Sequence, residues 1–331
     1  MDTTLKTSRH SLSPPPLHRC LLGDSLPMRS LRKQIDQLAH SQAPVYISGE
    51  SGSGKELVAR LIHDQGPRAG QRFVPINCGA IPAELMESEF FGHCKGSFSG
   101  AVEDKRGLFH AANAGTLFLY EVAGLPVHMR VKLLRAIQEK AVRRIGEQHE
   151  TAIDTRILCA THKSLNGEVL AGRFRQDLYY RLNVIEVRVP PLRERREDIE
   201  LLAGRVLQRL ARDSGRPLAW LQPQALKALK DYGFPGNVRE LENILERAHT
   251  LCENTRIEVS DLRMGQSHSP TGLRMTDIDK IDDLQHYLES IERQVLLQTL
   301  EETRWNRTAA AQRLSLSFRS MRYRLKKLGL E

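Results

Sequence analysis

A glycine-rich segment, GESGSGKE at residues 49–56, limits the folds open to this chain more than any other segment. It has the spacing G-x-x-x-x-G-K of a phosphate-binding loop and lies between an apolar run, 45–47, and a run of helical character, 57–62. Glycines let backbone amides approach an anion, and a lysine in this place reaches the terminal phosphates of a nucleotide. The alternative is a plain turn between a strand and a helix, but the complete motif in this context favours a nucleoside triphosphate site.

The predicted phosphate-binding set is the whole segment. Its members are Gly49, Glu50, Ser51, Gly52, Ser53, Gly54, Lys55 and Glu56. Glu56 departs from the general motif, in which a Ser or Thr hydroxyl usually contacts Mg²⁺.

Composition excludes several classes of protein. The chain has 331 residues, long enough for two or three domains, and no apolar run approaches the length of a membrane span. The N-terminus lacks the apolar core of a signal peptide, so we expect a cytoplasmic protein. The five cysteines are odd in number and form no C-x-x-C, which argues against a disulfide framework and against a zinc site.

Five apolar runs alternate with segments of helical character. The runs are 45–47, 73–76, 116–119, 156–160 and 184–189, and the clearest helical segment between them is 129–140. Such alternation predicts an α/β fold, a parallel sheet with helices on both faces. Polar residues follow the strands directly: Asn77, Glu121, Thr161 and His162. Ligands of open α/β sheets bind at these strand ends.

After Pro190-Pro191 the pattern becomes helical, over 198–213, 223–232 and 238–251, which predicts a small α-helical lid. Turn-forming residues then indicate a linker, followed by a helix over 282–303 and two short helices. The predicted division is a mobile leader at 1–19, an α/β core at 20–191, a lid at 192–264, a linker at 265–281 and a helix-turn-helix domain at 282–331.

Positive charge is concentrated in the C-terminal tail. The formal charge is +9, and residues 303–331 hold eight basic residues against one acid, a net charge of +7. A basic tail on a nearly neutral body is typical of a protein whose tail alone meets nucleic acid. Helices at 309–314 and 318–328, joined by a short turn, predict a helix-turn-helix whose second helix enters the major groove. The alternative is a solvated basic helix. The predicted DNA contacts are Ser317, Arg319, Ser320, Arg322, Tyr323, Arg324, Lys326 and Lys327.

From Leu21 onward the sequence resembles the bacterial enhancer-binding proteins, AAA+ ATPases that activate the sigma-54 form of RNA polymerase. Glu56 is usual in the phosphate-binding loop of that family. The run FGHCKGSFSGA at 91–101 resembles its GAFTGA loop, and RER at 193–195 and FPGNVREL at 234–241 resemble two further signatures. The tail is most similar to the type IV pilin regulators within the family.

The resemblance implies a role for each matching residue. Lys55 and the loop amides would hold the phosphates of ATP, Glu121 would polarise the attacking water, and Asn77 would restrain that glutamate. Thr161 and His162 would occupy the sensor position, and Arg239 would be the sensor of the lid. Arg175 and Arg181 resemble arginine fingers offered to a neighbouring subunit, which implies a hexameric ring; for each arginine the alternative is an ordinary ion pair. The loop implied to contact sigma-54 is Gly96, Ser97, Phe98, Ser99, Gly100 and Ala101.

Two departures from the family affect the interpretation. About 20 residues precede the ATPase core, so we expect no receiver domain. Tyr120 stands where the family has the aspartate that organises Mg²⁺, and a phenol cannot replace a carboxylate there. The resemblance, the phosphate-binding loop and the basic tail together predict an activator that binds double-stranded DNA at enhancer sites and uses ATP and Mg²⁺ to remodel sigma-54 holoenzyme. The rival prediction is a DNA-binding regulator that binds ATP, hydrolyses it poorly and modulates its relatives in mixed rings.

Overall fold

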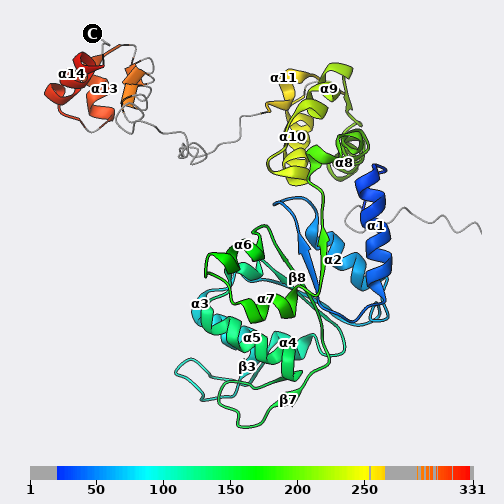
Figure 1. Ribbon diagram of the computed structural model, residues 1–331. Helices are drawn as coiled ribbons and strands as arrows, with labels where there is room; N and C mark the ends of the chain where they lie inside the picture. The colour runs from blue at the N-terminus through cyan, green and yellow to red at the C-terminus, as the bar shows by residue number, and fades with distance from the viewer. Residues whose placement is uncertain are drawn as a thin grey trace, which may run out of the picture. The chain divides into compact units, whose positions relative to one another are not determined.

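The computed structural model describes residues 21–252 and 255–264 and, in the tail, 289, 292–293, 296–297, 299–300, 303, 305–314 and 316–328. The chain forms two compact units, Met1–Gln266 and Ser267–Glu331 (Figure 1), and each is described by itself. The predicted leader and linker lie outside the described residues, as does most of the predicted helix at 282–303.

A five-stranded parallel sheet forms the centre of the first unit. Its strands are β1 (Val45–Ser48), β2 (Phe73–Asn77), β5 (Thr116–Tyr120), β8 (Arg156–Thr161) and β9 (Ile185–Arg188). Their order across the sheet is β2-β5-β8-β1-β9, so the strand that precedes the phosphate-binding loop lies between β8 and β9. The predicted α/β class is confirmed, and each strand lies within about a residue of the run that predicted it.

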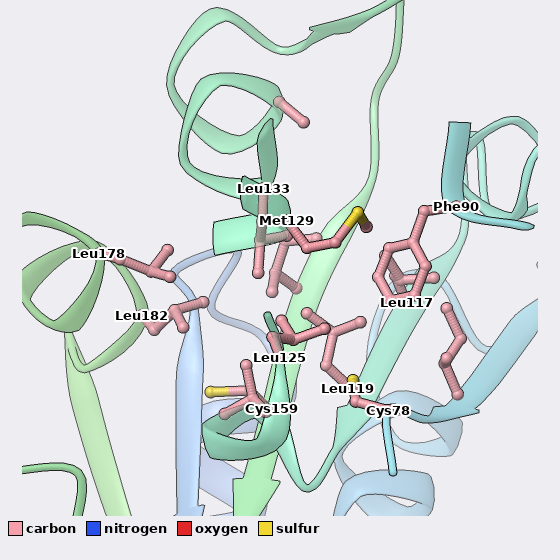
Figure 2. Close-up of a cluster of buried hydrophobic side chains, with 14 of the residues drawn as sticks. Cys78, Phe90, Leu117, Leu119, Leu125, Met129, Leu133, Cys159, Leu178 and Leu182 are labelled. Carbon is pink, nitrogen blue, oxygen red and sulfur yellow. The ribbon is translucent and has the colours of Figure 1, made fainter. Parts of the chain in front are cut away.

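Helices cover both faces of this sheet, because side chains that alternate along a strand point to opposite faces. On one face lie α1 (Leu26–Ala39) and α2 (Lys55–Asp64), packed on Phe118 and Leu158. On the other lie α3 (Ala83–Phe91), α4 (Leu108–Ala111), α5 (Val127–Glu139), α6 (Leu165–Leu170) and α7 (Gln176–Leu182). Figure 2 shows Met129 and Leu133 of α5 extending toward Leu117 and Leu119 of β5.

The lid is a helical layer with its own core around Phe234, Leu241 and Leu245. It contains η3 (Leu192–Glu194), η4 (Arg196–Asp198), α8 (Ile199–Ser214), α9 (Pro223–Asp231), α10 (Asn237–Leu251) and α11 (Val259–Leu262), with a two-residue pair, β10 (Trp220–Leu221) and β11 (Arg256–Ile257). The Asp198 carboxylate accepts hydrogen bonds from the amides of Asp24 and Ser25, at 2.7 and 2.9 Å. This contact ties the segment before α1 to the lid.

The sequence did not predict the other short elements. They are β3 (Gly92–His93), paired with β4 (Lys105–Arg106); β6 (Ala141–Val142), paired with β7 (Thr151–Ala152); and η2 (Val122–Gly124). Two residues are too few to show a periodicity, so these pairs become visible only when the chain is folded.

In the second unit, α13 (Arg307–Arg313) and α14 (Phe318–Lys327) form the predicted helix-turn-helix. Each begins with a side-chain cap: Asn306 accepts from the amides of Thr308 and Ala309, and Ser317 accepts from that of Ser320. Their small core contains Leu296, Leu300, Ala310, Ala311, Met321 and Leu325. No helix in the described parts of either unit has the length and apolar character needed to cross a membrane.

Candidate functional site

The phosphate-binding loop runs from the end of β1 into α2. Gly49, Gly52 and Gly54 have φ of 152°, 73° and 107°, backbone conformations that favour glycine. Lys55 begins α2 and is buried, and its Nζ donates to the carbonyls of Gly49 at 2.7 Å and Glu50 at 2.9 Å. Burial lowers the pKa of Lys55, and the charge of Glu121 opposes that effect. The loop therefore has the backbone conformations that its glycines allow, and its carbonyls surround the Lys55 side chain.

A cavity of about 410 Å³ adjoins this loop, between the sheet and the lid. It is lined by Leu21, Leu22, Leu57, Leu202, Val206 and Val238 among apolar residues, and by Gly52, Ser53, Gly54, Lys55, Glu56, Tyr120, Arg195, Arg209, Arg239 and Glu242. The apolar wall suits a base and the loop suits phosphates. The buried hydroxyl of Ser53 has no hydrogen-bond partner among the described residues, as expected for a site that a polar ligand completes. These residues fit a nucleotide.

Three lid arginines contact the loop. Arg193 forms a bidentate pair with Glu50 at 2.6 and 2.7 Å, and Arg195 donates from Nη2 to the Ser53 carbonyl at 3.0 Å. Arg239 donates to the Ser51 hydroxyl at 3.2 Å. The predicted lid residue Arg239 thus lies beside the phosphate-binding loop. Arg193 and Arg195 were not predicted as site residues, although the RER signature that contains them was available in the sequence.

Asn237 connects the lid to the loop and was also missed. Its side chain is fully buried; Nδ2 donates to the Ser51 carbonyl at 3.0 Å and to the Glu50 carboxylate at 3.1 Å, and Oδ1 accepts from the amide of Leu192 at 2.8 Å. The backbones also meet closely, because a Cβ on Gly52 would lie 2.2 Å from the Gly236 carbonyl. The lid and the loop are therefore in direct contact.

Glu121 follows β5 with φ of 57°, and its carboxylate is held from β8. Thr161 donates from its hydroxyl at 2.9 Å, and His162 Nδ1 lies 2.8 Å from the same oxygen. Burial raises the pKa of the Glu121 carboxyl, but the hydrogen bonds from His162 and Thr161 outweigh burial and lower it below its usual value. The described hydrogen bond of the Asn77 side chain is from the Gly79 amide, at 3.1 Å. Thr161 and His162, rather than Asn77, hold the glutamate in this structure.

Tyr120 occupies the wall between Glu121 and the loop. Its ring centroid lies 5.7 Å from Lys55 Nζ. Burial first, and then the charge of Glu121, raise the pKa of the Tyr120 phenol, so it is neutral at pH 7. Glu56 lies 3.5 Å from Arg60, its neighbour on α2. Because Mg²⁺ prefers anionic oxygen ligands, the donors around this loop fit a nucleotide better than they fit a firmly held magnesium ion.

The two candidate arginine fingers are on α7, and neither lines the nucleotide cavity of its own chain. Arg175 precedes the helix and pairs with Asp177 at 2.6 Å. Arg181 lies in the last turn, beside a separate cavity that Lys140 and Phe109 also line. The ion pair weighed as an alternative in the sequence is therefore present for Arg175.

The candidate sigma-54 loop lies between β3 and β4. The Gly96 amide donates to the Ala101 carbonyl at 2.8 Å, which closes the loop, and Ala101 itself is buried. Phe98 is 42% exposed, and its ring lies edge-on to the buried His93 ring at 5.0 Å. The exposed part of the loop is thus Phe98, Ser99 and Gly100, with Gly96 beside them.

On α14 the predicted DNA contacts differ in their surroundings. Arg319, Arg322, Tyr323, Lys326 and Lys327 are exposed, and Arg324 is partly buried. Arg324 pairs with Glu292, and Lys327 pairs with Glu289 at 2.9 Å.

Comparisons with known proteins cover both units. Residues 21–188 match the sigma-54 interaction domain, 193–277 the AAA+ ATPase lid domain, and 287–328 the Fis family of bacterial regulatory proteins. The response regulator protein PilR of Pseudomonas aeruginosa is 67% identical over 99% of this chain and 74% of its own length. The transcriptional regulatory protein ZraR of Escherichia coli K12 is 44% identical over 91% of this chain and 67% of its own length.

Among solved structures, NtrX from Brucella abortus in complex with ADP aligns with a TM-score of 0.72 and 32% identity, over 94% of this chain and 69% of that one. Its complex with ATP aligns similarly, with a TM-score of 0.71. The order of the three domains and the extent of these matches agree with the phosphate-binding loop, the lid and the helix-turn-helix found in the structure. This chain therefore belongs to the sigma-54-dependent transcription activators, the AAA+ enhancer-binding family.

Proposed function

We propose that this protein binds upstream DNA sites through its tail and uses ATP to remodel sigma-54 RNA polymerase holoenzyme at promoters. The observation that carries this proposal is the contact between lid and phosphate-binding loop, where Asn237 and three arginines meet the segment that would hold the phosphates. A change at the bound phosphates would move the lid, because lid residues contact the phosphate-binding loop directly. The nucleotide state is thereby converted into a movement of the protein.

In this proposal Lys55 and the loop amides bind the phosphates of ATP, and Glu121 accepts a hydrogen bond from the attacking water. Thr161 and His162 orient Glu121 and keep it anionic, since their hydrogen bonds lower its pKa. Arg175 and Arg181 complete the site of a neighbouring copy, where a guanidinium stabilises negative charge in the transition state. A site shared in this way requires a closed ring, and we propose a hexamer.

The other proposals concern the division of the chain and its partners. We propose an α/β core at 20–191, a lid at 192–264 and a DNA-binding domain at 282–331, in a cytoplasmic protein. Loop residues 96–101 would contact sigma-54, and Phe98 supports this because a half-exposed aromatic ring is suited to a protein contact. Magnesium would accompany ATP, and bound magnesium would offset phosphate charge.

One observation favours a second candidate function. Tyr120 supplies a neutral phenol beside Lys55, where an anionic ligand for the metal would serve hydrolysis. A chain of this kind would bind ATP and DNA but turn over slowly, and it would act by joining rings of active relatives.

The test is open-complex formation by purified sigma-54 holoenzyme on a supercoiled promoter with the protein's upstream site. The proposed function predicts ATP-dependent open complexes with the parent protein and none with Lys55→Ala, whose DNA binding serves as the control. Equal open-complex formation by both would refute the proposal. ATP binding without turnover or open complexes, together with inhibition of an active relative in mixed rings, would establish the second function.

A further inference from the structure

We propose that one stripe of α14, formed by Arg319, Arg322, Tyr323 and Lys326, reads the DNA site, and that Tyr323 is its specificity-determining residue. Arg324 and Lys327 are excluded from this role and instead hold α14 in the fold through ion pairs with Glu292 and Glu289. The inference rests on the proposed function, because it requires the tail to bind DNA.

The stripe follows from helical spacing. Its four residues stand at positions i, i+3, i+4 and i+7, which share one side of a helix. All four are exposed, and Tyr323 has 70% of its surface in solvent. The opposite side of α14 carries Met321 and Leu325, which are fully buried in the small core of this unit. The buried side fixes the direction in which the stripe faces.

Arg324, which is partly buried, and Lys327, which is exposed, lie on the flank of α14 between these two sides. Lys327 Nζ is 2.9 Å from a carboxylate oxygen of Glu289, and this hydrogen bond raises the pKa of the lysine. Arg324 pairs with Glu292 and lies 3.5 Å from the Ser320 hydroxyl through Nε. A cation that is already neutralised within the protein must lose its partner before it can neutralise a phosphate. These two residues therefore add little to the counterions released on DNA binding.

The members of the stripe offer different chemistry to the major groove. Arginine can donate two hydrogen bonds to guanine O6 and N7, and lysine neutralises phosphate. Tyr323, near the middle of the stripe, offers an apolar ring edge and one hydroxyl. The ring suits the methyl group of thymine, and the hydroxyl can donate to a base acceptor. We therefore assign Tyr323 to a thymine-containing step of a double-stranded site.

The experiment uses the full chain and two duplexes: one selected by the parent protein from a random 20-base-pair library, and a scrambled duplex of the same composition. Dissociation constants are measured at several NaCl concentrations. Lys326→Gln should reduce the slope of log affinity against log salt by about one per bound subunit, whereas Lys327→Gln should leave it unchanged. Tyr323→Ala should weaken binding to the selected duplex roughly tenfold and leave the scrambled duplex unaffected.

Glu289→Gln provides a matched test that leaves α14 unaltered. It releases Lys327, so the salt slope should increase and binding to the scrambled duplex should tighten. Loss of slope in Lys327→Gln equal to that in Lys326→Gln, or an equal effect of Tyr323→Ala on both duplexes, would overturn the inference. Failure of the parent protein to select any duplex would refute the DNA-binding function itself, which distinguishes the two failures.

Discussion

Tyr120 is the residue that most affects the expected rate of hydrolysis. It places a neutral phenol where a carboxylate would help to hold magnesium, and burial raises the phenol's pKa further. We predict that Tyr120→Asp increases magnesium-dependent phosphate release by roughly 100-fold or more, because a well-held metal contributes several kcal/mol to the transition state. Turnover is measured at equal concentrations of the oligomeric fraction, with ATP affinity determined separately.

Tyr120→Phe is the control for this change, since it keeps the ring beside Lys55 and removes only the hydroxyl. Its turnover should equal that of the parent. Substantial and equal turnover in the parent and in Tyr120→Asp would show that the site organises magnesium without the aspartate. The claim that Tyr120 slows hydrolysis would then be wrong.

Asn237 combines two constraints at one position. Its φ is 53°, and its buried side-chain amide forms hydrogen bonds with both the loop and η3. We predict that Asn237→Ala destabilises the first unit by about 2–4 kcal/mol, because unpaired buried polar groups cost ~1–3 kcal/mol and the left-handed backbone adds ~1 kcal/mol. Chemical denaturation of the two proteins, followed by circular dichroism, measures the difference.

Asn237→Gly separates these contributions, because glycine accepts the backbone conformation but makes no side-chain hydrogen bonds. It should recover about 1 kcal/mol relative to Asn237→Ala, and no more. If both variants unfold at the denaturant midpoint of the parent, the buried amide has no structural role between lid and loop.

At the scale of elements, the loop between β3 and β4 is supported from the segment between β6 and β7. The amide of Cys94 donates to the Ile145 carbonyl at 2.9 Å, and the Ile145 amide donates to the Gly92 carbonyl at 3.0 Å. A Cβ on Gly146 would lie 2.7 Å from the Cβ of Ser97, so the two segments are in close contact. A two-residue strand pair presents the loop, and the second segment keeps it in place.

We predict that Phe98→Ala abolishes stable capture of sigma-54 while leaving ATP and DNA binding intact. The ring is partly exposed and its described ring contact is a T-shaped one with His93, so we expect its removal to leave the fold unchanged. Capture is measured by native gel electrophoresis with sigma-54 and a transition-state analogue of ATP. Val102→Ala, a change at an exposed residue just beyond the loop, serves as the matched control. Capture by Phe98→Ala at the parental level would remove Phe98 from the interface.

At the scale of the whole molecule, charge and packing are divided between two units. The net charge of +7 over residues 303–331 should make DNA affinity depend steeply on salt. Each unit has its own buried core, around Phe234 and the sheet in the first and around Met321 and Leu325 in the second. Cutting the chain between the two cores should therefore separate ATP binding from DNA binding.

We predict that a chain ending at residue 281 stays soluble and binds ATP with parental affinity but loses site-specific DNA binding. Nucleotide affinity is measured with a fluorescent ATP analogue, and DNA binding by fluorescence anisotropy of the selected duplex. Site-specific binding by the shortened chain would show that the first unit contains a DNA-reading surface and would defeat the proposed division.

Much of the fold could be predicted from the sequence because its signals are local. An apolar run of three to six residues marks each central strand, and the glycines and Lys55 of the loop stand within eight residues of one another. Helical spacing likewise predicted α8, α9, α10 and α14 to within about one or two residues. The sequence by itself thus determined the α/β class, the phosphate-binding loop and the basic tail, since neighbours along the chain determine both backbone preference and periodicity.

Only the tertiary structure decided which residues complete the site. Arg193 and Asn237 reach Glu50 across 143 and 187 residues, and no periodicity connects positions so far apart. Packing also placed Thr161 and His162 within hydrogen-bond distance of the Glu121 carboxylate. In the tail it placed Arg324 beside Glu292 and Lys327 beside Glu289. Charge and residue type can be read from the sequence. Which residues form hydrogen bonds or ion pairs depends on the distances between side chains, and these are fixed only when the chain has folded.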